Sequence, residues 1–212
     1  MILIGQYDSP FVRRVAIALR LYGLPFEHRP WSTFGDGDKI APYNPLRRVP
    51  TLLLDGGEAL IESTAILDYL DELVGPDKAM IAAKGPERRH ALRICALATG
   101  LGDKAVSLVY ERVLRKDHQS KLWVARCEAQ IGGVLEVLEK ARANIASPYW
   151  FGAANRPRRH RGRLRAALHR RGASAIFQCR ALSGADGARR GLRSAAGLCR
   201  DRAAADPAER VG

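Results

Sequence analysis

The sequence lacks any apolar run of the length that a membrane span requires. A spanning helix needs about 20 consecutive apolar residues, and charged residues interrupt the apolar stretches of this chain well before that length. The first residues also lack the basic start and apolar stretch of a signal peptide. With 47% hydrophobic residues in 212 positions, the chain has enough apolar material for a sizeable core. We therefore expect a globular, cytoplasmic protein with no membrane partner.

Cysteine is scarce, and its spacing argues against several kinds of site. Cys95, Cys127, Cys179 and Cys199 are far apart and form neither a CxxC pair nor a ligand cluster with the five histidines. A structural zinc site or a disulfide framework is therefore not expected. The expected role of these cysteines is that of small buried hydrophobic residues. We predict no metal and no bound cofactor.

Lysine is absent from residues 151–212, although the whole chain has a formal net charge of +13. This segment holds 15 Arg against 4 Asp+Glu residues, whereas residues 1–150 hold 20 Lys+Arg against 18 Asp+Glu. Arg, Ala and Gly fill 38 of its 62 positions. Because the codons of these three residues are rich in G and C, one interpretation is a GC-rich gene read out of frame beyond about Gly152.

A basic nucleic-acid-binding tail is the alternative interpretation of this segment. Such segments usually mix Lys with Arg and carry aromatic residues that stack on bases. Phe177 is the only aromatic residue after Phe151. Nucleic acid is therefore not the partner that we expect.

Residues 1–29 have the pattern of a strand, a helix and a second strand. Residues 1–6 form a short apolar run typical of a buried strand. Ser9 and Pro10 then predict the start of a helix, with Ser9 as N-cap, and Gly23 is a suitable residue for its end. Residues 26–29 predict the second strand, and such a unit requires parallel pairing of its two strands.

A hairpin and a further helix follow. Residues 51–54 and 59–61 are apolar and flank the turn Asp55-Gly56-Gly57, which is a good hairpin signal. Ser63 is predicted to cap a helix that runs to about Leu73. The order β-α-β-β-β-α predicts an α/β thioredoxin-like domain with a mixed four-stranded sheet over residues 1–79.

Two long helices are predicted after a linker bracketed by Gly-Pro pairs, over roughly residues 87–114 and 120–144. Each has an apolar face. The residues on these faces are Leu92, Cys95, Ala96 and Thr99 in the first helix, and Ile131, Val134, Leu135 and Leu138 in the second. Long antiparallel helices joined by a short connection imply a bundle. We predict a partial all-α domain over 86–152, incomplete or disordered beyond it, and an Arg/Ala/Gly-rich tail over 153–212.

Ser9 is the strongest candidate for a chemical role. It sits where a strand gives way to a helix, so its hydroxyl and the free backbone N–H groups of the helix favour a negative charge at one place. A free thiol has a pKa near 8.5, and one hydrogen bond to its anion would lower that pKa by roughly one to two units. The turn itself carries no cysteine between Ser9 and Val12, which excludes disulfide exchange there. Read alone, Ser9 would be only an N-cap.

Three segments together carry a family resemblance. The stretches Tyr7–Val15, Arg48–Thr51 and Glu62–Ile66 resemble the glutathione-binding face of glutathione transferases. Ser-Pro-Phe-Val followed by two basic residues is similar to the signature of the bacterial serine-type enzymes. The resemblance implies that Ser9 is the catalytic residue that stabilises the glutathione thiolate. Tyr7 is the rival donor, since some relatives use a tyrosine near the end of the first strand.

The resemblance also implies how the rest of glutathione is held. Pro50 would follow a cis peptide bond, and the backbone of Val49 would pair with the cysteinyl residue. Arg48, or its neighbour Arg47, would reach the glycyl carboxylate, although either can equally be a solvated charge.

Glu62 and Ser63 would hold the γ-glutamyl end of glutathione. The carboxylate would take the ammonium group, while the hydroxyl and the helix N-terminus would take the α-carboxylate. A second-substrate pocket is expected between the two domains. Its candidate residues are Trp31, Phe34, Thr99, Asp103 and Tyr110.

The function that the resemblance implies is conjugation of glutathione, as co-substrate, to a small electrophile by a homodimeric enzyme. The resemblance fails after Gly152, so weak activity or none is also expected of such a chain. The alternative is a non-catalytic protein of the same fold that binds ligands or partners. An isomerase of the maleylacetoacetate type is less favoured, because the Ser-Ser pattern with Cys of that branch is missing.

Overall fold

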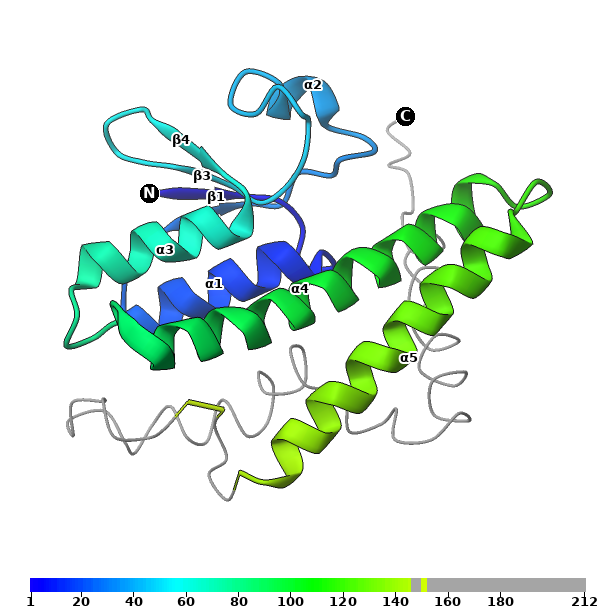
Figure 1. Cartoon of the computed structure of the whole chain (residues 1–212). Coiled ribbons are helices and arrows are strands. Elements are labelled where there is room, and N and C mark those ends of the chain that lie inside the picture. The colour runs from blue at the N-terminus through cyan, green and yellow to red at the C-terminus, as the bar shows by residue number, and fades with distance from the viewer. Residues whose placement is uncertain (146–149, 152–212) are drawn as a thin grey trace, which may run out of the picture.

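A small mixed sheet, three shorter helices and two long helices make up the described part of the fold (Figure 1). The computed structural model describes residues 1–145 and 150–151. The elements in chain order are β1 (Ile2–Ile4), α1 (Pro10–Tyr22), β2 (Glu27–Arg29), α2 (Gly37–Ile40), β3 (Thr51–Leu53), β4 (Ala59–Ile61), α3 (Ser63–Val74), α4 (Gly85–Leu114) and α5 (Lys121–Ala143). The tail predicted over 153–212 lies outside the described residues.

The sheet has four strands in the order β2-β1-β3-β4. β1 and β2 are parallel, with Ile2 opposite Glu27, while β1–β3 and β3–β4 are antiparallel. In Figure 1, α1 and α3 lie together below the sheet, and α2 lies on the side away from them. The predicted element order and mixed sheet are therefore confirmed. The short helix α2 was not predicted; Ile40 within it is fully buried.

The start of α1 agrees with the sequence prediction. Ser9 is the N-cap, and its Oγ accepts a hydrogen bond from the backbone N–H of Val12 at 3.3 Å. Pro10 is the first helical residue, and Gly23 ends the helix with a left-handed φ of 70°. The core lies between α1, α3 and the sheet. Its fully buried members include Leu3, Val12, Val15, Leu19, Leu52, Ile66 and Leu70.

The start of α3 differs from the prediction that Ser63 caps it. Glu62 occupies the N-cap position with φ 67° and makes no side-chain cap bond, while Ser63 is the first helical residue. The physical reason is the length of the connection. β4 ends at Ile61 and α3 begins at Ser63, so one residue must reverse the chain direction. It does so with a positive φ that non-glycine residues rarely adopt.

The predicted apolar face of α4 is correct only in part, since Cys95 and Thr99 are partly buried but the other two residues are not. The structure buries Ala91, Ile94 and Leu108 on this helix, whereas Leu92 is 38% exposed and Ala96 is exposed. Successive residues of a helix point about 100° apart around its axis, so a face displaced by one residue is a different face. The face is set by α1 and α5, which both pack against α4, and sequence periodicity does not identify such neighbours.

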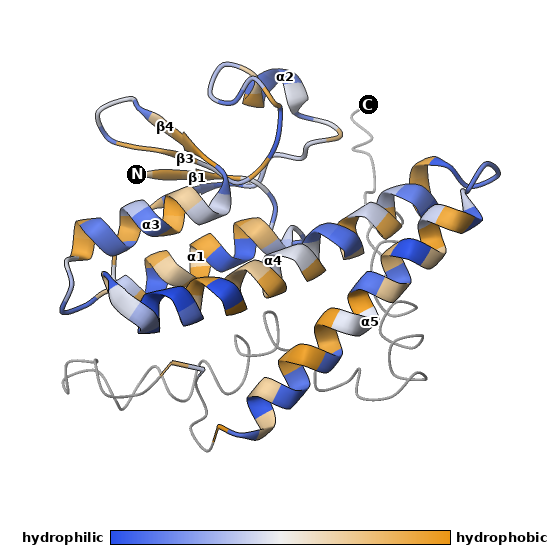
Figure 2. Ribbon diagram, in the orientation of Figure 1, coloured by the Kyte–Doolittle hydropathy of each residue, from blue (hydrophilic) through white to orange (hydrophobic). Residues whose placement is uncertain are grey.

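The predicted face of α5 agrees better with the structure, since Leu138 is buried and Ile131, Val134 and Leu135 are partly buried. Figure 2 shows hydrophobic strands in the sheet, and α4 and α5 with mixed hydropathy along their length. Cys127 is buried and Cys95 partly buried, both as free thiols. Cys179 and Cys199 lie outside the described residues.

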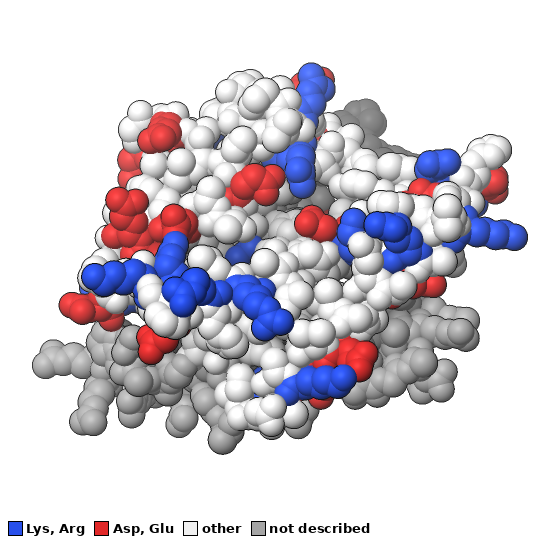
Figure 3. All heavy atoms as spheres, viewed as in Figure 1, with Lys and Arg blue, Asp and Glu red and all other residues white. Residues whose placement is uncertain are grey.

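The charged side chains of the visible face are mixed in sign. In Figure 3, Lys and Arg gather along the first half of α4 and around the α4–α5 turn, with Asp and Glu among them. Within residues 1–145, no helix combines the length and the apolar character needed to cross a bilayer. The predicted domain boundaries at residues 79, 86 and 152 stay predictions.

Candidate functional site

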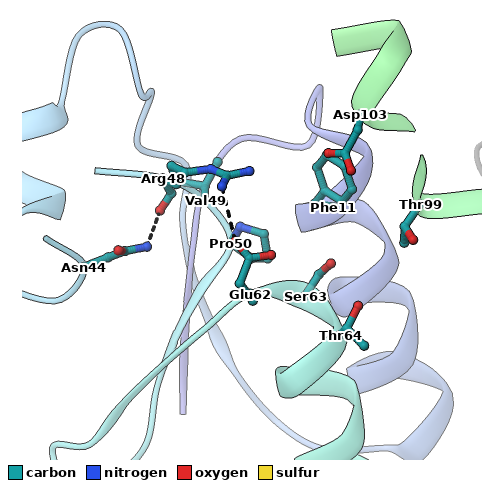
Figure 4. Close-up of a pocket in the computed structure, with 10 residues that line it drawn as sticks. All are labelled: Phe11, Asn44, Arg48, Val49, Pro50, Glu62, Ser63, Thr64, Thr99 and Asp103. Atoms are coloured by element: carbon teal, nitrogen blue, oxygen red, sulfur yellow. Dashed lines mark hydrogen bonds and ion pairs between the residues drawn. The ribbon is translucent and has the colours of Figure 1, made fainter. Parts of the chain in front are cut away.

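A pocket of about 230 Å³ lies where the segment before β3, the start of α3, the start of α1 and the middle of α4 meet (Figure 4). Its lining residues are Phe11, Asn44, Arg48, Val49, Pro50, Glu62, Ser63, Thr64, Thr99 and Asp103. The three sequence segments that carry the family resemblance therefore converge on one place. Five of the six predicted glutathione-binding residues line this pocket. The sixth, Ser9, is not among the lining residues and lies two residues before Phe11, which is.

The first turn of α1 forms one border of the pocket through Phe11. Ser9 precedes this turn and is partly buried. Its Oγ accepts the N–H of Val12, and no described residue accepts a hydrogen bond from its hydroxyl. A hydroxyl group has one donor and two acceptor positions, so Ser9 can still donate to a ligand.

The hydroxyl of Tyr7, the rival donor, does not lie at the start of α1. The Tyr7 ring stacks on His28 with centroids 4.0 Å apart, and its hydroxyl accepts a hydrogen bond from Arg20 at 3.3 Å. Arg20 belongs to the last turn of α1. A helix of this length rises by roughly 15 to 20 Å between its first and last turns. The Tyr7 hydroxyl therefore lies toward the far end of α1.

Hydrogen bonds from the Asn44 side chain fix the segment Arg48–Pro50 in place. Sequence reasoning did not identify Asn44 as a site residue. Asn44 is 2% exposed, and its Nδ2 donates to the Arg48 carbonyl at 2.9 Å and to the Thr51 hydroxyl at 3.2 Å. Its Oδ1 accepts the N–H of Leu46 at 3.0 Å. The Val49–Pro50 peptide bond is cis, as the resemblance implied. Asn44 precedes Pro45 in a polar stretch. The preference of Asn for turns was therefore the one sequence signal that could have identified it.

The two arginines before Val49 have different partners. Arg47 forms an ion pair with Asp38 at 2.9 Å and does not line the pocket. Arg48 forms an ion pair with Glu62 at 3.4 Å, and both side chains are 59% exposed. Exposed pairs of this kind contribute at most about 1 kcal/mol, so a ligand charge can displace either partner.

Arg14, the second of the two basic residues that follow Ser-Pro-Phe-Val, makes a contact that sequence reasoning missed. It lies on α1, and its Nη1 donates to the Oγ of Ser63 at 3.3 Å across the α1–α3 contact. Burial lowers the pKa of the Arg14 guanidinium. Burial also raises the pKa of the Cys95 thiol on α4, with the Arg14 charge acting in the opposite direction. The sequence pattern of this helix does not indicate the contact, because Ser63 lies 49 positions away in the chain.

The structure separates the five second-substrate candidates. Thr99 and Asp103 line the pocket from α4. Phe34 meets Tyr110 edge-on with centroids 5.4 Å apart, and these side chains are 67% and 42% exposed. Trp31 is not brought to the pocket, because it packs against Tyr43 at 6.2 Å and under the Arg29 guanidinium.

Close packing of α4 on α1 explains why Thr99 and Asp103 reach the pocket. A Cβ at Gly102 would lie 3.4 Å from Cζ of Phe11 and 3.8 Å from Cγ of Pro10. The α4 backbone therefore lies close to the first turn of α1, at a distance where an added Cβ would make ordinary van der Waals contacts. Asp103, the next residue, consequently lies beside that turn (Figure 4).

Comparison with known proteins gives consistent relatives. Residues 3–78 match the family model described as glutathione S-transferase, N-terminal domain. The chain is 34% identical to the uncharacterized GST-like protein YibF of Escherichia coli over 66% of this chain and 68% of that protein.

Solved structures agree with this match. A glutathione transferase family member from Pseudomonas fluorescens Pf-5, with bound glutathione, is 32% identical with a TM-score of 0.60, over 66% of this chain and 70% of that one. A glutathione S-transferase from Methylobacterium radiotolerans, in complex with glutathione sulfonate, has a TM-score of 0.68 at 27% identity, over 100% and 99% of the two chains.

Proposed function

The chain belongs to the glutathione S-transferase family, and from this premise we propose that it binds glutathione in the pocket of Figure 4 and conjugates it to an electrophile. The observation that carries the proposal is the convergence of the α1 start, the segment Arg48–Pro50 and the pair Glu62–Ser63 on one pocket. Each of these groups carries a charge or a hydrogen-bonding atom suited to one part of glutathione.

The glutathione sulfur lies at the α1 end of this pocket in our proposal. The Ser9 hydroxyl donates to the thiolate, and the positive end of the helix dipole adds to its stabilisation. The thiol proton leaves to solvent. The thiolate then attacks an electrophilic carbon, so that a carbon–sulfur bond forms while the leaving group departs with its electron pair. The protein acts mainly by positioning and by electrostatics.

The two ends of the tripeptide bind in our proposal to two residues that form an ion pair in this structure, since Arg48 and Glu62 lie 3.4 Å apart. The backbone of Val49 pairs with the cysteinyl residue, as a strand would. Glu62 takes the γ-glutamyl ammonium and Ser63 takes the α-carboxylate. Arg48, once its exposed pair with Glu62 is exchanged for ligand contacts, takes the glycyl carboxylate.

The electrophile enters between the glutathione site and α4. Thr99 and Asp103 border it on the pocket side, and Phe34 and Tyr110 offer aromatic surface farther along α4. Trp31 is left out of this proposal because of its packing against Tyr43. A two-fold dimer and a cytoplasmic location remain predictions of the family resemblance.

A binding assay and a turnover assay together test the function. The full chain is expected to be retained on immobilised glutathione and to conjugate glutathione to 1-chloro-2,4-dinitrobenzene. Retention without turnover would favour the non-catalytic binder. Failure of both would contradict the proposal as a whole.

Replacing Glu62 with glutamine should weaken glutathione binding. We expect the KM for glutathione to rise about tenfold, with kcat within about twofold, because the ammonium group loses a charge-assisted hydrogen bond at a partly solvated site. The matched control is Glu58→Gln, which removes the same charge from the hairpin turn outside the pocket. An equal change in KM for the two variants would contradict the assigned role of Glu62.

A further inference from the structure

The α4 side of the pocket carries a negative charge that no cation offsets. Asp103 lines the pocket from α4, and its side chain is exposed. Among residues 1–145 and 150–151, no lysine, arginine or histidine lies within ion-pair distance of the Asp103 carboxylate. The next residue, Lys104, places its ammonium over the Trp123 ring of α5 at 5.2 Å. The charge of Asp103 is therefore available to a ligand.

The other charges of the pocket lie on the glutathione side. Among the ten lining residues, only Arg48 has a positive side chain, and it pairs with Glu62 at 3.4 Å. Figure 4 shows this pair beside Pro50, whereas Asp103 lies apart from it, next to Phe11. In the proposed binding mode, glutathione takes both members of the pair, so it leaves the Asp103 carboxylate without a partner.

Aromatic rings border the same side of the pocket. A Cβ at Gly102 would lie 3.4 Å from Cζ of Phe11, so this ring lies against the turn of α4 that carries Asp103. Tyr110 follows Asp103 by seven residues, which places it on the same face of α4 about 10 Å farther along the helix. The Tyr110 ring meets Phe34 edge-on, and both side chains are exposed. Aromatic faces attract cations, and a carboxylate beside them adds to that attraction.

We propose that Asp103 is a specificity-determining residue, which favours electrophiles that carry a positive charge on an aromatic or apolar body. This inference rests on the proposed function and names the substrate class of that site. The glutathione thiolate and the Asp103 carboxylate are two negative charges that border one space. A cationic electrophile is attracted by both charges, and an anionic one is repelled by both. The protein therefore selects its electrophile by charge as well as by shape.

The test uses three benzyl chlorides that differ in the charge of one para substituent. The substituents are trimethylammoniomethyl, its neutral carbon counterpart 2,2-dimethylpropyl, and the anionic carboxymethyl group. With each compound the thiolate attacks the benzylic carbon, a carbon–sulfur bond forms, and chloride leaves with its electron pair. We expect Asp103→Asn to lower the cation-to-neutral ratio of kcat/KM by about fivefold and to raise the anion-to-neutral ratio by a similar factor, the equivalent of one exposed ion pair. Comparing ratios between two proteins cancels the intrinsic reactivity of each compound.

Two further variants and a salt series make the result specific. Asp117→Asn removes the same charge from the exposed connection between α4 and α5, so it should leave both ratios unchanged. Asp103→Lys should move both ratios farther than Asp103→Asn does, in the same directions. Added salt should shrink the difference between the wild type and Asp103→Asn, because it screens exposed charges. A change by the same factor for all three compounds would mean that the charge acts on the sulfur alone, and that outcome would overturn the inference.

The failure of this inference can be told apart from failure of the proposed function. Binding of the three S-benzyl conjugates of glutathione gives a readout that needs no turnover, and Asp103→Asn should weaken the cationic conjugate about fivefold relative to the neutral one. If the wild type neither turns over the chlorides nor binds the conjugates, the proposed function falls and the inference falls with it. If the wild type conjugates glutathione with the same ratios as Asp103→Asn, only the role of Asp103 falls.

Discussion

Replacing Ser9 with alanine is expected to lower kcat/KM for conjugation by about tenfold to a hundredfold. The Ser9 hydroxyl is the donor at the start of α1, and a hydrogen bond to a charged acceptor contributes about 1.5 to 3 kcal/mol. Its loss should raise the pKa of the bound thiol by roughly one to two units. The pH profile of kcat measures this directly, because the rise toward the plateau should move to higher pH by the same amount. The thiolate is the reactive form, so activity is lost mainly below the new pKa.

The structural role of Ser9 as an N-cap needs its own control. Ser120 caps α5 in the same way, with its Oγ accepting the N–H of Trp123 at 3.2 Å. Each Ser→Ala change should lower the free energy of unfolding by about 1 kcal/mol. Ser120→Ala should leave the pH profile unchanged. If Ser9→Ala does the same, Ser9 is only a cap and the proposed mechanism is wrong.

Replacing Asn44 with alanine is expected to have the largest effect on stability, lowering the free energy of unfolding by about 2 to 3 kcal/mol. The buried Asn44 side chain makes three hydrogen bonds, two to Arg48 and Thr51 and one from Leu46. Each such bond contributes about 1 kcal/mol, and the buried groups left behind lose their partner. Because the same bonds hold the segment before Pro50, glutathione binding should weaken as well.

Urea denaturation measures the stability change, and Asn144 provides the matched control. Asn144 ends α5, and its Nδ2 makes one exposed hydrogen bond to the Lys140 carbonyl at 3.2 Å. Asn144→Ala should therefore lower the free energy of unfolding by less than about 1 kcal/mol. Equal losses for the two variants would mean that the Asn44 bonds do not hold the segment in place.

Local rules predicted the elements whose ends depend on one or two residues. The Ser9–Pro10 pair gave the start of α1, Gly23 gave its end, and the turn at Asp55-Gly56-Gly57 gave the β3–β4 hairpin. Helix N-caps, left-handed glycines and hairpin turns act over a few residues, so the sequence alone carries them.

The remaining features depend on residues far apart in the sequence. The contact between Arg14 and Ser63 forms only when α1 packs against α3. The buried face of α4 is chosen by α1 and α5, and the positive φ of Glu62 follows from the direct joining of β4 to α3. Asn44 is recognisable as a site residue only when the segment that it holds is seen to line the pocket.

The central claim is that the Ser9 hydroxyl stabilises the thiolate of bound glutathione. The most direct test is an ultraviolet titration of the thiolate absorbance of glutathione bound to the wild type and to Ser9→Ala. We predict that the wild type ionises the thiol roughly one to two units below its value of about 8.5 in water, and that Ser9→Ala restores a value near 8.5. A bound thiol that titrates near 8.5 in the wild type, or identically in the two proteins, would contradict the claim.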